Sequence, residues 1–96
     1  MQTKNQFGRA LRFARKAKDL SQEEFGDVSS RTYVSALERD IYTPTLEKIE
    51  ELASVIGIHP LTLITLAYSS KLDPKSVKSL VQLVTDESIA ICDARQ

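Results

Sequence analysis

The sequence predicts an all-α protein, with five helices in one domain and an additional helix at the C-terminal end. Apolar residues recur at the three- and four-residue spacing of a helix face along most of the chain. The 96 residues include only three Gly and three Pro, which are too few for a turn-rich β-architecture. Each proline stands where a new helix is expected to begin.

The first helix is expected over about residues 4–18 and carries a basic outer surface. Its apolar stripe consists of Phe7, Ala10, Leu11, Ala14 and Ala17. Residues 1–20 hold six basic side chains and one acidic one, although the net charge of the whole chain is zero. Such a segment favours a local anion-binding face, but an ordinary solvated helix face explains it as well.

A short second helix is expected over about residues 22–27. Ser21 and Glu24 form the S-x-x-E pattern of a capping box, in which each side chain bonds to the backbone N–H of the other residue. Gly26 and the pair Ser29-Ser30 interrupt the helix soon after it begins. Either serine can cap a third helix that runs through Arg39.

The fourth helix is expected to begin at Thr43-Pro44, with Thr43 as the cap and Pro44 in the first turn. Its buried stripe consists of Leu46, Ile49, Leu52, Ala53 and Ile56. Gly57 suits the left-handed position that ends a helix. His59-Pro60 then opens a fifth helix over about residues 60–70, and this helix is apolar around most of its circumference.

A sixth helix begins at Asp73-Pro74, with Asp73 as its cap. Its apolar residues Val77, Leu80, Val81 and Val84 share one stripe. The short apolar run 89–92 can be a last helical turn or an edge strand. We expect residues 1–70 to form one domain and residues 71–96 to form a C-terminal helical extension.

Composition excludes several classes of protein. One Cys and one His leave no set of residues for a zinc cluster, and they make Ser–His–Asp chemistry improbable. The acidic pairs along the chain have no convergent base or nucleophile, so we expect no enzyme, no metal and no cofactor. The N-terminus lacks the apolar stretch of a signal peptide, and no run of about 18 apolar residues is long enough to span a membrane. The expected compartment is the cytoplasm.

A short capped helix, a tight turn and a second short helix follow the basic first helix, which is the layout of a helix-turn-helix. Residues 7–66 resemble the helix-turn-helix domain of phage lambda/434-type repressors, the XRE or Cro/C1 family. The segments that carry this resemblance are Arg12, Arg15, Leu20-Ser21-Gln22-Glu23-Glu24-Phe25, Tyr33-Val34-Ser35-Ala36-Leu37-Glu38-Arg39, Pro44-Thr45-Leu46 and Ile49 to Ile58. The resemblance implies a lambda-repressor-like fold, a double-stranded DNA partner and a bacterial or phage origin.

The resemblance also implies roles for individual residues. The helix over residues 30–39 would enter the major groove, where Arg31, Thr32, Ser35 and Ala36 would read bases. The residues that would contact backbone phosphates are Gln22, Ser30, Tyr33, Arg39, Tyr42 and Thr43, with Arg9 and Lys4 as weaker candidates. Arg15 and Glu38 would form a largely buried salt bridge that fixes the recognition helix without touching DNA.

The sequence departs from the family pattern at the turn. The segment from Gln22 to Glu38 is two residues shorter than usual, and the usual Gly of the turn is missing. These changes leave the register of the recognition helix open. Asp40 stands where a Gly is frequent, and we expect an acid there to face the phosphates unfavourably.

The leading functional hypothesis is a transcriptional regulator, a repressor, that binds a palindromic operator as a homodimer. One recognition helix reads only a few base pairs, so useful specificity needs two half-sites. The dimer interface is expected at Leu61, Ile64, Tyr68, Val77, Leu80, Val81 and Val84. The sixth helix could instead cover the fifth within a monomer. The alternative function is a protein-interaction module or an antitoxin that binds a partner protein with the same fold.

Overall fold

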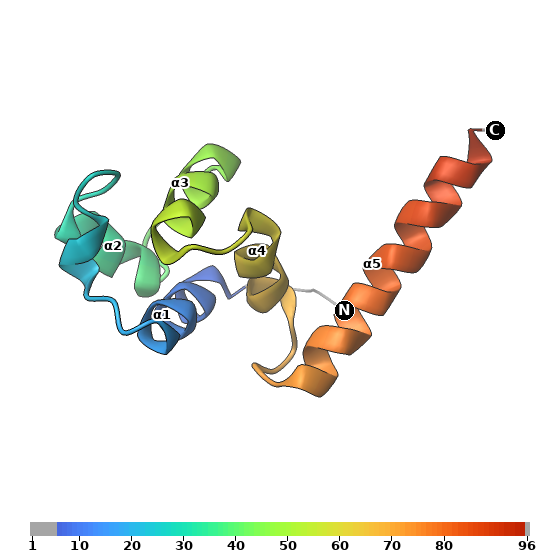
Figure 1. Cartoon of the computed structure of the whole chain (residues 1–96), viewed down its shortest axis with the longest axis horizontal. Coiled ribbons are helices and arrows are strands. Elements are labelled where there is room, and N and C mark those ends of the chain that lie inside the picture. Colours follow the sequence, from blue (N-terminus) through green and yellow to red (C-terminus); the bar gives the residue numbers. More distant parts are fainter. Residues whose placement is uncertain (1–5, 96) are drawn as a thin grey trace.

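A computed structural model describes residues 6–95, and within this range every regular element is a helix (Figure 1). The elements are α1 (Phe7–Ala17), the 3-10 helix η1 (Gln22–Phe25), α2 (Arg31–Glu38), α3 (Leu46–Ile56), α4 (Pro60–Tyr68) and α5 (Pro74–Ala94). The all-α prediction is confirmed, with two differences at the N-terminal end. The second element is a single 3-10 turn, and residues 4 and 5 of the expected first helix lie outside the described range.

The hydrophobic core lies between the first five elements. Its fully buried large apolar side chains come from every one of them and are Leu11, Phe25, Val34, Leu37, Leu52 and Leu63. The stripe spacing seen in the sequence explains this core, because each helix turns its apolar face inward. Helix α1 packs against both α2 and α4, so it lies at the centre of the domain.

Helix starts follow local capping chemistry. Ser30 Oγ accepts the Tyr33 N–H at 3.1 Å, and His59 Nδ1 accepts the Leu61 N–H at 3.0 Å. The expected cap of α3 was wrong by two residues. Thr45 Oγ1 caps this helix through the Lys48 N–H at 3.1 Å, so Thr43 and Pro44 precede the cap. Proline disfavours helical backbone in the residue before it, which keeps Thr43 outside the helix.

Two helices of the domain end on an aspartate with left-handed backbone. Asp19 after α1 has φ of 57°, and Asp40 after α2 has φ of 59°. In both places the N–H of the aspartate and the N–H of the following residue bond back to carbonyls of the last turn, which is the Schellman arrangement usually completed by Gly. Gly57 takes the same kind of conformation after α3, with φ of 84°, as expected.

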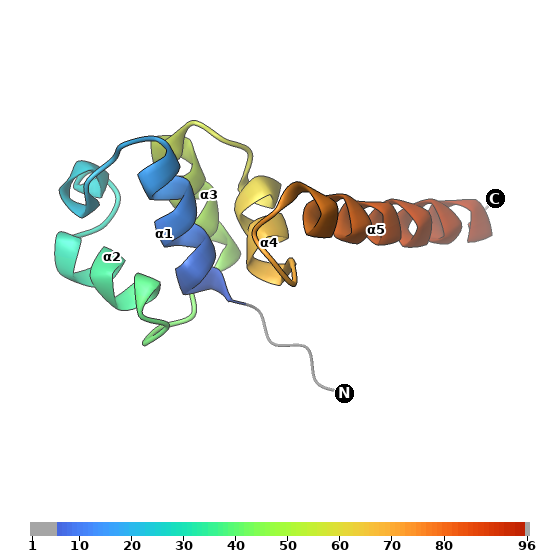
Figure 2. The same cartoon turned by 90° about the horizontal axis from the view of Figure 1, so that it is seen from below.

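Helix α5 projects from the domain as a rod (Figure 2), and the molecule measures 46 × 26 × 25 Å. Its start is capped as expected, because Asp73 Oδ1 accepts the Ser76 N–H at 2.8 Å. This hydrogen bond lowers the pKa of the Asp73 carboxyl. The run 89–92 belongs to the helix, so the edge-strand alternative was wrong.

The described part of α5 has no buried residue. Its exposed large apolar side chains are Val81, Leu83, Val84, Ile89 and Ile91. Among residues 6–95, no single helix has the length and apolar character to cross a membrane. The pair of α3 and α4 meets that test jointly, by length and composition only, and is bent by 107°.

Candidate nucleic-acid interface

Five polar side chains, from η1, α2 and the residue that follows α2, border one shallow hollow on the surface of the domain. They are Gln22, Arg31, Thr32, Ser35 and Arg39. Arg31 and Thr32 are exposed in the first turn of α2, and Ser35 is half-buried one turn later. The hollow therefore has donors and acceptors on its rim and two guanidinium groups, which is the chemistry that base edges and phosphates require.

The register of α2 follows from its cap. Ser30 is the residue before the helix, so Arg31 takes the first helical position and Thr32 the second. Ser35 stands four residues after Arg31 and hence on the same side of the helix. The Ser35 carbonyl also accepts the Arg39 Nε–H at 3.4 Å.

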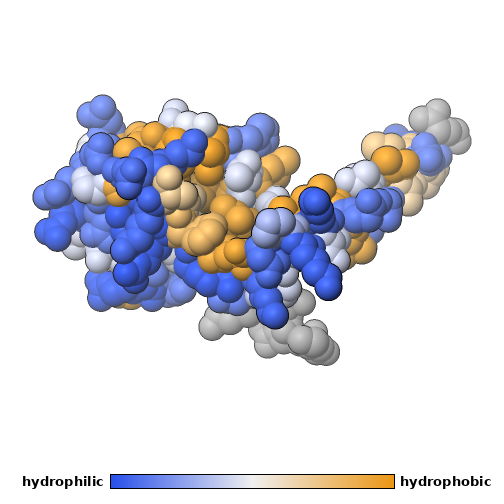
Figure 3. Space-filling view, turned by 60° about the horizontal axis from the view of Figure 1, so that its bottom comes forward, coloured by the Kyte–Doolittle hydropathy of each residue, from blue (hydrophilic) through white to orange (hydrophobic). Residues whose placement is uncertain are grey.

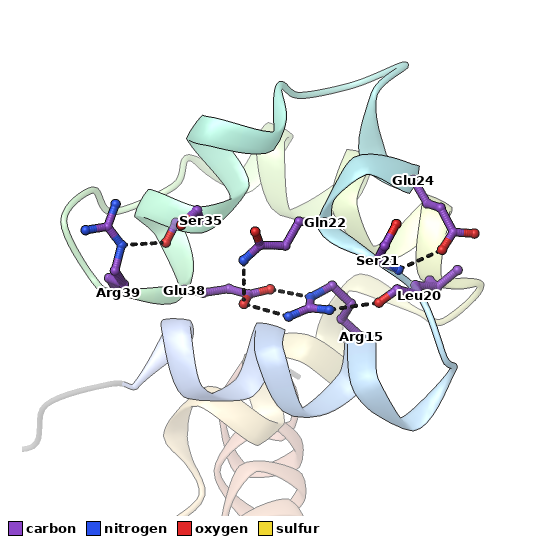
Figure 4. Close-up of polar contacts among 8 residues, drawn as sticks. All are labelled: Arg15, Leu20, Ser21, Gln22, Glu24, Ser35, Glu38 and Arg39. Carbon is purple, nitrogen blue, oxygen red and sulfur yellow. Dashed lines mark hydrogen bonds and ion pairs between the residues drawn. The ribbon is translucent and has the colours of Figure 1, made fainter.

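An ion pair between Arg15 and Glu38 joins α1 to α2 (Figure 4). Arg15 Nε donates to Glu38 Oε2 at 2.6 Å, and Nη2 donates to Oε1 at 3.0 Å. The third donor, Nη1, bonds to the Leu20 carbonyl at 2.8 Å. These side chains are 10% and 5% exposed, and the hydrogen bonds to Glu38 raise the pKa of Arg15.

Gln22 reaches the same ion pair from η1. Its Nε2 donates to Glu38 Oε1 at 3.1 Å, so the side chain lies across the gap between η1 and the end of α2 (Figure 4). An amide nitrogen carries two N–H groups, and only one of them is needed for Glu38. The contact orients Gln22 at the rim of the hollow and is compatible with the phosphate contact expected of it.

The other expected phosphate contacts do not belong to the lining of this hollow. Tyr33 and Tyr42 stack with ring centroids 5.6 Å apart and an interplanar angle of 26°. Tyr42 and Thr43 are exposed in the loop after α2, and Ser30 is exposed at its N-terminus. Ser30 and Tyr33 lie at the start of α2, whereas Thr43 borders a separate hollow lined by residues of α1, α3 and α4.

Ala36 does not fit the role expected of it. Its side chain is 5% exposed and therefore lies on the inner side of α2, away from any base that the exposed side of the helix could contact. Arg9 donates from Nη2 to the Ser69 carbonyl at 2.9 Å, which ties α1 to the end of α4. The other weak candidate, Lys4, lies outside the described residues.

Asp40 also has a different role from the one expected. Its Oδ1 accepts the Gly8 N–H at 3.0 Å, so the carboxylate is directed at the start of α1. The backbones are close here, because a Cβ on Gly8 would lie 2.5 Å from the Glu38 carbonyl oxygen. Asp40 therefore helps to hold α1 against the end of the recognition helix, while its positive φ supplies the turn that Gly usually makes.

Lys48 is a residue near this surface that sequence reasoning missed. It belongs to α3, and its Nζ donates to the Val28 carbonyl, in the turn between η1 and α2, at 2.7 Å. The same nitrogen lies 5.8 Å from the centre of the Tyr33 ring. In the sequence Lys48 has the appearance of an ordinary surface lysine of a helix, and no local pattern marks it.

The residues expected at a dimer interface lie around the junction of α4 and α5. An apolar groove there is bordered by Leu61, Ile64, Thr65, Tyr68, Leu80, Val81, Leu83, Val84 and Glu87. Val77, the remaining expected residue, is half-buried at the neighbouring turn of α5. Figure 3 shows apolar side chains gathered where the domain meets α5 and again along that helix.

The fold and the exposed start of α2 define a DNA-binding helix-turn-helix protein. A comparison with protein families agrees, because the family described as "Helix-turn-helix" matches residues 11–63, more than half of the chain. The chain belongs to this family, which is the XRE/Cro-C1 type with its lambda-repressor-like fold, as the sequence resemblance implied. Comparisons with curated proteins and with solved structures give no match.

Proposed function

We propose that this protein is a transcriptional repressor that binds a palindromic operator as a homodimer, with α2 in the major groove. One observation carries the proposal. Gln22, Arg31, Thr32, Ser35 and Arg39 border a single hollow, although Gln22 belongs to η1 and the others belong to α2 or directly follow it. The family match supplies the double-stranded DNA partner.

The chemistry of the exposed helix start suggests how bases are read. The Arg31 guanidinium can donate two hydrogen bonds to O6 and N7 of guanine. Thr32 offers a hydroxyl, or its methyl group to thymine, and Ser35 offers a hydroxyl. The backbone would be held by Gln22, Ser30, Tyr33, Arg39, Tyr42 and Thr43, and such contacts set position without reading sequence.

Dimerisation would use the groove between α4 and α5. Residues 1–70 would then be the DNA-binding domain, and residues 71–96 the dimerisation element. A helix with no buried residue gains stability when a second copy covers its apolar side chains. Two half-sites would give the specificity that one recognition helix lacks, as is usual for a regulator acting on DNA in the cytoplasm of a bacterium.

Selection of bound DNA from a random library tests this function. The wild-type protein should enrich an inverted repeat. Arg31→Ala should lose about 1–3 kcal/mol of specific affinity and relax the preference at one position of each half-site. Gln22→Ala serves as the matched contrast, because losing a phosphate contact should weaken binding to all sequences alike.

A second candidate is a module that binds a partner protein, as an antitoxin does. The exposed groove of α4 and α5 favours it, since such a surface also fits a different protein. The library experiment separates the two candidates. A folded protein that enriches no DNA sequence would refute the repressor and leave the interaction module.

A further inference from the structure

The ammonium group of Lys48 is held from three directions. Its Nζ donates to the Val28 carbonyl at 2.7 Å and forms an ion pair with Glu51 Oε1 at 2.8 Å. The Tyr33 ring lies on a third side, with its centroid 5.8 Å away. The side chain is 23% exposed, so much of it is packed against these neighbours.

These contacts join parts of the chain that are separate in sequence. Lys48 is in α3, Val28 is in the turn before the recognition helix, and Tyr33 is in the first half of α2. Tyr33 stacks in turn on Tyr42 in the following loop. Lys48 therefore connects α3 to the turn before α2 and to α2 itself, through one hydrogen bond and one cation–aromatic contact.

The turn that Lys48 reaches is the part of the motif that departs from the family pattern. The segment that contains it is shorter than usual and lacks the usual Gly, and within the turn the N–H groups of Val28 and Ser29 bond to the Phe25 carbonyl. A charge-assisted hydrogen bond to a backbone carbonyl is stronger than a neutral one and restricts the position of that peptide group. The Val28 carbonyl is two residues before Ser30, the cap on which the register of α2 depends.

We infer that Lys48 is a positioning residue for sequence recognition, which holds the shortened turn and the first turn of α2 where Arg31 and Thr32 can read bases. The inference rests on the proposed DNA-binding function. Base reading by a bidentate side chain tolerates little displacement, whereas a phosphate contact tolerates more. Loss of Lys48 should therefore reduce specific binding more than non-specific binding.

The experiment compares full-length Lys48→Met and Lys48→Arg with the wild type. Methionine keeps the length of the side chain but donates no hydrogen bond, whereas arginine keeps the charge and the donors. Lys18→Met is the matched control, because it removes one exposed positive charge at the end of α1. Fluorescence anisotropy gives Kd for the enriched operator and for random DNA over a range of salt concentrations, and circular dichroism gives Tm.

For Lys48→Met we expect about a tenfold loss of operator affinity, with non-specific affinity changed by about twofold or less. Lys48→Arg should recover most of the loss, and Lys18→Met should not change the ratio of the two affinities. Equal losses on both DNAs with a salt slope reduced by about one would make Lys48 a phosphate ligand and overturn the inference. A lower Tm with an unchanged affinity ratio would overturn it too, because the role would be structural only.

Amide hydrogen exchange separates this inference from the proposed function. Lys48→Met should speed exchange at the Tyr33 and Val34 amides, which bond to Ser30, while the amides of α4 keep their protection. If the wild type enriches no DNA sequence, the proposed function fails and the inference fails with it as a statement on recognition. If the operator is found but exchange and affinity ratio stay unchanged in Lys48→Met, only the inference is refuted.

Discussion

Replacing Arg15 with methionine should destabilise the whole domain. The guanidinium satisfies both oxygens of the Glu38 carboxylate and the Leu20 carbonyl, with hydrogen bonds between 2.6 and 3.0 Å. Methionine fills much of the same space but leaves Glu38 charged, with the Gln22 amide as its remaining described side-chain partner. A carboxylate in that position has lost its water and its counter-ion together.

The structure sets the size of the effect. The side chains of the pair are 10% and 5% exposed, so the surrounding solvent screens them little. Removing one partner of a buried pair costs about 3–5 kcal/mol. In a domain of this size 1 kcal/mol shifts Tm by about 4–8 °C, so we expect Arg15→Met to lower Tm by about 12 °C or more.

Thermal unfolding followed by circular dichroism measures the loss, and a double variant tests its cause. Arg15→Met/Glu38→Met removes the stranded charge and should regain much of the lost stability, because an apolar pair of similar size replaces a buried ion pair at little cost. A single variant that melts within about 2 °C of the wild type would refute the reasoning. So would a double variant less stable than the single one.

Three further predictions follow from other features. Truncation after Ser70 should convert a dimer to a monomer in sedimentation equilibrium while the domain stays folded. A monomeric full-length protein would contradict an interface at α4 and α5. Because the pKa of Asp73 is lowered, the ionised carboxylate stabilises the start of α5 at pH values above its ordinary pKa of 3.8. This stabilisation is lost as the pH falls through the lower pKa of the folded protein, so helicity should decrease there; an NMR titration that gives Asp73 a pKa at or above 3.8 would contradict this. Asp19→Gly should raise Tm, because glycine adopts the left-handed backbone without strain. Asp40→Gly should not raise Tm, because it also removes the hydrogen bond from the Gly8 N–H; equal Tm shifts in calorimetry would show that this hydrogen bond does not stabilise the fold.

Local chemistry made most of the fold predictable. The caps at Ser30, His59 and Asp73 depend on residues within three positions along the chain, so a sequence pattern contains the whole interaction. The start of α3 shows the limit of such patterns. Thr43 and Thr45 flank the same proline and both can cap a helix, so local propensity does not choose between them.

The site was less predictable, because its details depend on contacts between distant parts of the chain. Whether Ala36 faces the core or the DNA depends on the rotation of α2 about its own axis as it packs against α1. No neighbouring residue in the sequence indicates this rotation. Lys48 and Val28 are 20 residues apart, and the bond between them has no signature in either segment. Asp40 was interpreted from a family pattern, whereas its partner Gly8 is 32 residues away.

The two connections between α1 and α2 limit how the protein can adapt to DNA. The Arg15–Glu38 pair and the Gly8–Asp40 bond join these helices at separate points, so α2 cannot change its angle without moving α1 as well. In the dimer that we propose, the two reading helices would then move only as rigid blocks. A longer or shorter spacing between half-sites would then require a change of conformation in the segment between Tyr68 and Pro74, which joins each block to its α5.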